Sequence, residues 1–199
     1  MTTSLTYFNF EGSRGLECRL ALTLAGVAFE DIRLDRPQWM ELKPTTPFGA
    51  MPVFQEGGRT LAQSNAILTY VGRTHGLHPA DPWLAAEHEA IMQSVEDLRH
   101  KMPARVDMSD DEKRTAREEF AAGWLKTWAG TVSARVQGPF LEGAAIHVAD
   151  IKLAVILKGF LAGTYDYIPA STFDAWPKLV ALVAAVNAHP AVVKYNSAR

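Results

Sequence analysis

The hydrophobic pattern of this sequence changes partway along the chain, and the change limits the folds open to it. Up to about Gly76, short runs with the two-residue period of strands alternate with runs that have the period of a helix. The pattern predicts strands within 5–10 and 28–34 around a helix at 13–26, which Gly26 ends. It then predicts two strands within 52–62, joined at Gly57-Gly58, and a helix at 64–75. After Ala62 every strong pattern is helical. We therefore predict an α/β domain followed by an all-α domain.

The boundary between these domains is predicted in a short segment that contains Pro79 and Pro82, because paired prolines are typical of a linker. We assign residues 1–76 to the first domain, 77–84 to the linker and 85–199 to the helical domain. In the helical domain, apolar residues recur every three or four positions in two stretches. Ser109 and Glu112 form a capping-box pattern that predicts a helix start.

The composition excludes several classes of function. The net charge is -2 and the 20 Lys and Arg residues are scattered, so nucleic acid is not an expected partner. The N-terminus lacks a basic segment followed by an apolar one, and the longest apolar stretch contains Lys152 and Lys158, so we expect neither export nor a membrane span. Cys18 is the single cysteine, which excludes an internal disulfide framework and favours the cytoplasm.

Pro52 stands at the start of the third predicted strand, where its missing backbone N–H needs an explanation. An ordinary trans proline at an edge strand is one explanation. The order βαβ followed by ββα is that of a thioredoxin-like domain, a fold in which a cis proline precedes the third strand. A cis bond there would let Met51 present its backbone N–H and C=O to a peptide-like ligand.

The chain resembles the soluble glutathione transferases along almost its whole length, and among them the sigma class, which includes the haematopoietic-type prostaglandin D synthases. The segments that carry this resemblance are "LTYFNFEGSRG", "QWMELKPTTPFGAMPVF", "LAQSNAILTYVG", "IMQSVEDL", "GAAIHVADIKLAVIL" and "HPAVVKY". The resemblance implies a thioredoxin-like domain that binds glutathione and a helical domain that supplies most of the second-substrate pocket. It selects the cis alternative for Pro52.

The resemblance matches Tyr7, at the end of the first strand, to the family's catalytic tyrosine. A hydroxyl that donates a hydrogen bond to the glutathione sulfur would favour the thiolate, which is the nucleophile. Taken alone, Tyr7 could instead be a core aromatic. Ser13 is the rival for the catalytic role because other transferase classes use a serine near a helix start, and its ordinary role would be an N-cap. Cys18 is expected to be a buried, inert thiol.

Further residues are expected to hold glutathione. Gln63 and Ser64 precede a helix, whose free N–H groups can bind the γ-glutamyl carboxylate. Trp39 and Lys43 lie four apart in a loop-like stretch, where an indole N–H and an ammonium can meet the glycyl carboxylate. The resemblance places Asp97 at the position that reaches the ligand of the other subunit in a homodimer, although it could be a solvated carboxylate. The complete predicted set is Trp39, Lys43, Met51, Pro52, Gln63, Ser64 and Asp97.

The family pattern also predicts the walls of an electrophile pocket. These residues are Phe8, Phe10, Arg14, Arg99, Ala104, Lys152 and Ile156. Lys152 is the one charged residue in an apolar helix, so it should face a wet cavity, an acidic partner or the surface. Lys152 and Arg99 would favour anionic electrophiles if they face the pocket. In the alternative, both cations point to solvent or pair with Glu11 or Glu96.

His147 departs from the family pattern, which has a Ser or Thr cap at the start of the central buried helix. Imidazole is rarely used as a cap, so the cap geometry is open, while Asp150 is expected to bond backbone donors at the helix start. Some relatives bind a divalent ion at the subunit interface through several acids, but Gln93 replaces one of them here. We therefore expect no metal requirement.

These expectations describe a homodimeric, cytoplasmic glutathione transferase of the detoxification type, which conjugates the thiolate of glutathione to small electrophiles. Glutathione is the co-substrate. Two alternatives stay open at this point. One is a glutathione-dependent isomerase like the prostaglandin synthases, and the other is a non-catalytic member that binds ligands through the same scaffold.

Overall fold

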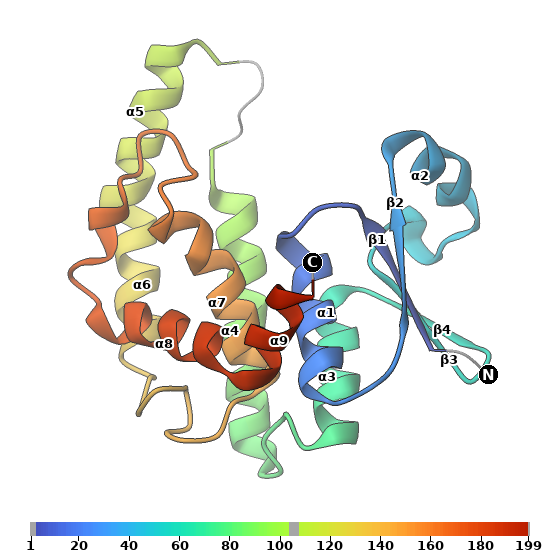
Figure 1. Cartoon of the computed structure of the whole chain (residues 1–199). Helices are drawn as coiled ribbons and strands as arrows, with labels where there is room; N and C mark the ends of the chain where they lie inside the picture. The colour runs from blue at the N-terminus through green and yellow to red at the C-terminus, as the bar shows by residue number, and fades with distance from the viewer. Residues whose placement is uncertain (1–2, 104–107, 199) are drawn as a thin grey trace. The chain divides into compact units, whose positions relative to one another are not determined.

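A computed structural model describes residues 3–103 and 108–198 of the chain (Figure 1). The chain divides into two compact units. The first comprises Met1–Glu89 together with His189–Arg199, and the second comprises Ala90–Ala188, so the division falls within helix α4 (Pro82–Lys101). Within the described ranges, no helix has the length and apolar character that a bilayer crossing requires. Each unit is described by itself.

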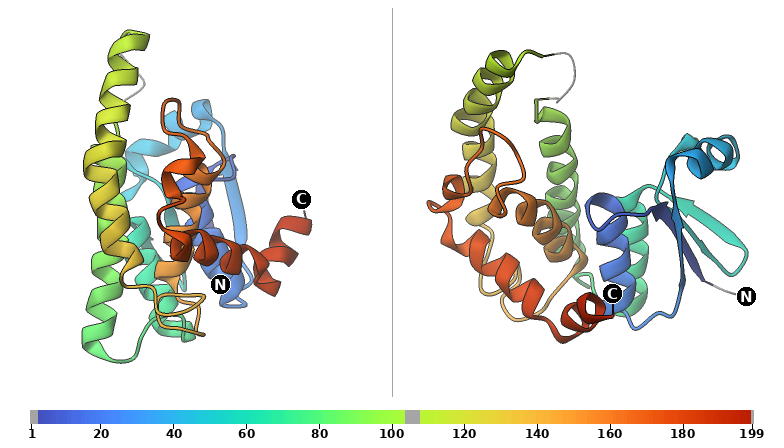
Figure 2. Two further views of the ribbon diagram at one scale, coloured as in Figure 1. Left: turned by 90° about the vertical axis from the view of Figure 1, so that its left-hand side faces the viewer. Right: turned by 45° about the horizontal axis from the view of Figure 1, so that its top comes forward.

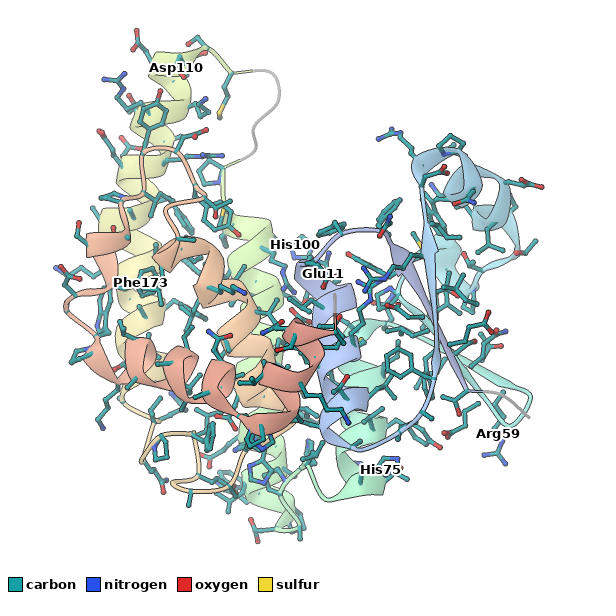
Figure 3. The ribbon with its side chains drawn as sticks, viewed as in Figure 1. Glu11, Arg59, His75, His100, Asp110 and Phe173 are labelled. Atoms are coloured by element: carbon teal, nitrogen blue, oxygen red, sulfur yellow. The ribbon has the colours of Figure 1, made fainter. Side chains whose placement is uncertain are left out.

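The first unit is built on a four-stranded sheet in the order β2-β1-β3-β4. Its strands are β1 (Ser4–Phe8), β2 (Glu30–Leu34), β3 (Val53–Glu56) and β4 (Arg59–Ala62). β2 is parallel to β1, whereas β3 is antiparallel to both β1 and β4. Gly57 and Gly58 both have positive φ, which two-residue hairpin turns require, and they join β3 to β4 as predicted. Arg59 lies beside this turn (Figure 3).

Helices α1 (Ser13–Leu24) and α3 (Ser64–His75) pack side by side on one face of the sheet (Figures 1 and 2). That face is fully apolar where they meet it, since Leu5 is 0% exposed and Phe54 is 3% exposed. Gly26, at φ 68, follows α1 as the predicted stop. α9 (Pro190–Ser197) also belongs to this unit and contacts α1.

The segment between β2 and β3 was predicted as a loop, and this is wrong. It contains α2 (Arg36–Leu42) and two 3-10 turns, Lys43–Thr45 and Pro47–Gly49. Asp35 accepts a hydrogen bond from the N–H of Gln38, and the Gln38 side chain accepts one from the N–H of Asp35, so a capping box starts the helix. α2 lies on the side of the sheet away from α1 and α3 (Figures 1 and 2).

The second unit is helical, and in its described part no strand follows Ala62 apart from isolated bridges within 140–145. Its elements are the C-terminal part of α4, α5 (Asp110–Phe120), a π-helical segment (Ala121–Leu125), α6 (Lys126–Ser133), α7 (Val148–Leu161), a 3-10 turn (Ala170–Phe173) and α8 (Pro177–Ala188). The predicted capping box of Ser109 and Glu112 is confirmed at the start of α5. The α/β plus all-α class, with a thioredoxin-like first unit, is therefore confirmed.

Helix α7 is the centre of the second unit, because almost every one of its residues is buried. Phe160 packs against Phe173, which is 0% exposed, with ring centroids 5.3 Å apart (Figure 3). His147, whose capping role the sequence left open, occupies the N-cap position of α7. The Asp150 carboxylate accepts hydrogen bonds from the N–H groups of His147 and Leu141, both at 2.8 Å, which confirms its expected bonds to backbone donors.

Candidate active site

One end of the sheet brings together three of the predicted site positions. Thr6, Val53 and Ala62 are paired across β1, β3 and β4, so they form one row of the sheet. Tyr7 follows this row in β1, Pro52 precedes it before β3, and Gln63 follows it after β4. Because β3 runs antiparallel to the other two strands, these three residues lie at the same end.

Tyr7 is a residue of β1, and its side chain packs against α1. It is 6% exposed, and its ring lies 5.8 Å from the Phe8 ring and 5.7 Å from the Phe10 ring, measured between centroids. Gly15 of α1 makes this packing possible, since a Cβ atom at Gly15 would lie 2.0 Å from Cδ1 of Tyr7. The position of the tyrosine ring therefore depends on a residue without a side chain.

Ser13 does not cap α1. The helix begins at Ser13 itself, and Gly12 occupies the N-cap position without any side-chain hydrogen bond. The predicted ordinary role of Ser13 as an N-cap is wrong for this reason. Ser13 has φ 54, a conformation that costs a non-glycine residue free energy and that occurs preferentially at functional sites.

The Met51–Pro52 peptide bond is cis, as predicted. Gln63 has φ 72 and ψ 115, and it is the N-cap residue of α3. This backbone conformation is strained for a residue with a side chain. Ser64, which is 4% exposed, begins α3, so the unbonded N–H groups of the first helical turn start at the same end of the sheet as Tyr7. Such N–H groups favour an anionic ligand.

Trp39 and Lys43 lie in and just after α2, rather than in a loop. The Trp39 ring packs edge-on against Phe8, with centroids 6.2 Å apart. Lys43 is exposed and is the C-cap residue of α2. The contact with Phe8 places α2 beside the segment that follows Tyr7.

A buried arginine that the sequence analysis missed holds the same segment. Arg19 of α1 is fully buried, and its NH1 and NH2 groups donate to the carbonyl oxygens of Phe10 at 3.1 Å and Phe8 at 3.2 Å. Its Nε donates to Asp31 at 2.8 Å. The guanidinium carbon also lies 6.0 Å from the centroid of the Tyr7 ring. Arg19 therefore fixes the backbone on which Tyr7 and its neighbours are carried.

The Asp31 carboxylate continues this network through Arg33, whose Nε lies 2.7 Å from Oδ2. Arg33 also pairs with Glu11, which precedes α1 (Figure 3), and Glu11 accepts a hydrogen bond of 3.3 Å from the Tyr195 hydroxyl of α9. Nothing in the sequence signals the last contact, because its partners are 184 positions apart. Positive and negative side chains alternate along this network, so each charged group in it has a partner of opposite charge.

Two of the predicted residues in the second unit, Lys152 and Arg99, contact the same carboxylate. Lys152 is fully buried, and its ammonium lies 2.6 Å from Oε1 of Glu96. Arg99 NH1 lies 2.5 Å from the same oxygen. Both cations thus pair with Glu96, as the alternative held. The shared carboxylate neutralises part of their charge and weakens the support for a pocket selective for anions. Ile156 is buried beside them on α7, and Asp97 is exposed on α4. Ala104 lies outside the described residues.

Comparisons with known proteins agree with this architecture. A family model described as glutathione S-transferase, N-terminal domain, matches residues 3–73, and one described as glutathione S-transferase, C-terminal domain, matches residues 96–199. Hematopoietic prostaglandin D synthase of Gallus gallus is 30% identical over 98% of this chain and 95% of its own length. The chain belongs to the glutathione S-transferase family.

Two further proteins are similar to this chain, and they differ in how much of it they match. Glutathione S-transferase 1 of Ascaris suum is 45% identical, but the match covers 47% of this chain and 45% of that protein, so the chain spans less than half of it in this match. A structure titled monomeric Na-GST-3, a glutathione S-transferase of the hookworm Necator americanus, is 27% identical with a TM-score of 0.82, covering 100% of this chain and 98% of that one.

For this glutathione S-transferase family member, Gly15→Ala should disturb the site without touching a polar group. The new methyl would overlap the Tyr7 ring and force it to move, because the nearest ring atoms would lie 2.0, 2.5 and 2.7 Å away. We expect about a tenfold loss of conjugation rate and about 1–3 kcal/mol of lost stability, measured by steady-state kinetics and urea unfolding.

Gly123→Ala is the matched control, because a Cβ at Gly123 of the π-helical segment meets nothing within 4 Å. It should leave the conjugation rate unchanged and raise the stability by about 0.5–1 kcal/mol, because alanine is favoured over glycine inside a helix. A Gly15→Ala enzyme with wild-type turnover would show that the Tyr7 ring is not fixed by α1.

Proposed function

We propose that this protein is an enzyme that conjugates the thiolate of glutathione to small electrophiles, with the Tyr7 hydroxyl stabilising the thiolate. The observation that carries the proposal is the common location of Tyr7, cis Pro52 and the strained Gln63 at one end of the sheet. A free thiol has a pKa near ~8.5, so at neutral pH it needs stabilisation as the anion. Lowering that pKa by about two units takes about 2.7 kcal/mol of differential stabilisation.

The same end of the sheet suits the rest of the tripeptide. We assign the γ-glutamyl carboxylate to Gln63, Ser64 and the N-terminus of α3, where oriented N–H groups favour an anion. We assign the glycyl carboxylate to Trp39 and Lys43, which donate an indole N–H and a charged ammonium. Met51 is the proposed main-chain partner of the cysteinyl unit, as the resemblance implies.

The residues proposed to contact the electrophile are those that the family pattern predicts for the pocket. Phe8, Phe10 and Arg14 come from the first unit, and Phe10 is 45% exposed, so an aromatic surface is available next to Tyr7. Arg99, Lys152 and Ile156 come from the second unit, and Ala104 completes the proposed set. Because Glu96 neutralises part of the charge of Arg99 and Lys152, we propose a generic apolar electrophile rather than an anionic one.

Two measurements test the proposed function. Retention on immobilised glutathione, eluted by free glutathione, tests the binding half of the proposal. Conjugation of 1-chloro-2,4-dinitrobenzene then tests turnover. Retention without turnover of this or any electrophile in a small panel would support the non-catalytic alternative, and absence of retention would contradict the proposal itself.

The isomerase alternative is favoured by one finding, the 30% identity to a hematopoietic prostaglandin D synthase. It uses the same Tyr7-stabilised thiolate, which would add to the substrate and later be expelled. The alanine at position 104 stands where the prostaglandin synthases carry a tryptophan, which makes this activity the less favoured one. Turnover of prostaglandin H2 without turnover of aryl halides would reverse the order of the two proposals.

We also propose a homodimer of the sigma-like class in which Asp97 contributes to the glutathione site of the partner. Exposure of Asp97 on α4 leaves it accessible for this contact. The dimer needs a direct test, because Na-GST-3 is titled monomeric. Sedimentation equilibrium with and without glutathione supplies it. We also propose a cytoplasmic location, which the single cysteine, Cys18, favours. A role in detoxification is proposed from the resemblance alone.

Asp97→Ala should raise the Michaelis constant for glutathione about tenfold without dissociating the dimer, because one charge-assisted hydrogen bond to the γ-glutamyl ammonium is lost. Glu118→Ala, which removes an exposed carboxylate from α5, is the control and should change nothing. An unchanged Michaelis constant for Asp97→Ala, or a monomer with full affinity, would contradict the shared site. We expect EDTA to leave the rate unchanged, since no metal is proposed.

A further inference from the structure

The first unit contains a cavity of about 600 Å³ on the face of the sheet that α1 and α3 leave uncovered. A volume of this size is typical of a small-molecule site. Its floor is the sheet, and its roof is α2 with the two 3-10 turns that follow it. None of the proposed glutathione or electrophile residues lines it.

The floor is defined by the strand register. Ile32, Thr6 and Val53 are paired side by side across β2, β1 and β3, and all three line the cavity. Successive side chains of a strand point to opposite faces, so Thr6 faces the cavity while Tyr7 faces α1. The cavity and the catalytic tyrosine are therefore on opposite faces of the same sheet. Leu34 extends the apolar part of the floor.

The roof does not fill this space. α2 has no buried residue, although Leu42 and Glu41 on it line the cavity. An amphipathic helix on a sheet normally buries its apolar side chains against the strands. Here Leu42 is 36% exposed, and Ile32 and Leu34 beneath it are only partly buried. The gap is thus bounded by apolar side chains above and below.

Charge decides which ligand this cavity would take. Glu41 is the one ionisable residue among the described residues that line it, and no Lys, Arg or His is present. The other polar groups are hydroxyls and amides, of which Thr45 and Thr46 already donate to backbone carbonyls. The amide oxygens of Gln38 and Gln55 also already accept hydrogen bonds, from Asp35 and Ser4. The Glu41 carboxylate is therefore the main acceptor that the lining offers, and it is complementary to a cation.

We propose that this cavity is a second ligand site that binds small aromatic or aliphatic amines in their protonated form, with the apolar part against Ile32, Leu34 and Val53 and the ammonium at Glu41. The site is separate from that proposed for glutathione and does not depend on the proposed reaction. Trp39 and Lys43, which are assigned to the glycyl carboxylate, lie on or directly after the helix that carries Glu41, so a ligand at the Tyr7 face is expected to change the affinity of this cavity without excluding its ligand.

The test uses three naphthalenes of similar size and different charge, namely 1-naphthylmethylamine, 1-naphthalenemethanol and 1-naphthoate. Each is titrated by calorimetry with the protein alone and with saturating S-hexylglutathione. The amine should bind most tightly, and it should still bind when S-hexylglutathione is saturating. Competition by S-hexylglutathione, or equal affinities for the three probes, would overturn the proposal. Failure of S-hexylglutathione itself to bind would count against the glutathione site only.

Two variants locate the binding. Glu41→Gln should weaken the amine about fivefold and leave the alcohol unchanged, because the change removes one charge-assisted contact at an exposed position. Glu30→Gln, which neutralises an exposed carboxylate of β2 outside the lining, is the matched control. Thr60→Phe, on edge strand β4, should narrow the cavity and weaken binding of all three probes. Amine affinity that survives Glu41→Gln undiminished refutes the site even if Thr60→Phe fails to fold.

Discussion

Replacing Tyr7 by Phe should lower the turnover of glutathione conjugation by about 10- to 150-fold. A hydrogen bond to a charged group contributes about 1.5–3 kcal/mol, and the loss of one from the thiolate raises the barrier by that amount. The apparent affinity for glutathione should change less than about threefold, because the hydroxyl is proposed to act on the sulfur and other residues are proposed to hold the carboxylates of the peptide. The ring itself stays, so its packing against Phe8 and Phe10 is preserved.

A second readout separates this chemical role from a structural one. The pKa of the bound glutathione thiol, followed by thiolate absorbance, should rise in Tyr7→Phe toward the value of the free thiol. Ser13→Ala is the comparison, since Ser13 is the rival hydroxyl near the start of α1. It should leave both turnover and thiol pKa nearly unchanged. If Tyr7→Phe keeps wild-type turnover and Ser13→Ala loses it, Ser13 rather than Tyr7 stabilises the thiolate. The proposed sigma-like class would then be wrong.

The sequence alone predicted those elements whose structure depends on one hydrophobic period or on one turn. α3 was predicted at 64–75 and is observed at Ser64–His75, because its apolar stripe begins after a polar step and ends at Gly76. The hairpin at Gly57 and Gly58 followed from turn chemistry alone. α2 was missed because it has seven residues and no buried face, although Asp35 and Gln38 carried a capping signal.

Only part of the candidate site could be predicted from the sequence. Its location at one end of the sheet follows from the strand order. The cis bond at Pro52 could be predicted only from the family resemblance, because about 5% of X-Pro bonds are cis and the neighbouring residues alone left both isomers open. The support beneath Tyr7 was not predictable. Arg19 reaches carbonyl oxygens in the segment before α1, and Tyr195 reaches Glu11 from the other end of the chain. Such contacts depend on the assembled fold and have no sequence period.

Asp150 should be the most costly single residue to remove from the helical unit. Its two oxygens accept the N–H groups of Leu141 and His147, and the side chain is 0% exposed. Asp150→Ala leaves both donors buried without that acceptor, which should cost about 2–4 kcal/mol of unfolding free energy. Asp174→Ala, an exposed acid of the same unit, is the control and should fall within about 0.5 kcal/mol of wild type. Urea unfolding at constant pH measures both.

The pH dependence of this residue has a defined sign. Burial raises the pKa of Asp150 to about 7, against the opposing effect of the two N–H donors, whereas an aspartate in the unfolded chain titrates near ~3.9. The folded state therefore binds the proton more tightly, so the stabilisation is complete below about pH 4 and is lost as the pH rises through 7. The stability difference between wild type and Asp150→Asn should shrink over this window, on the order of 4 kcal/mol, while groups common to both proteins cancel. A difference that stays flat or grows with pH would mean that the N–H donors outweigh burial and keep Asp150 ionised in the folded protein.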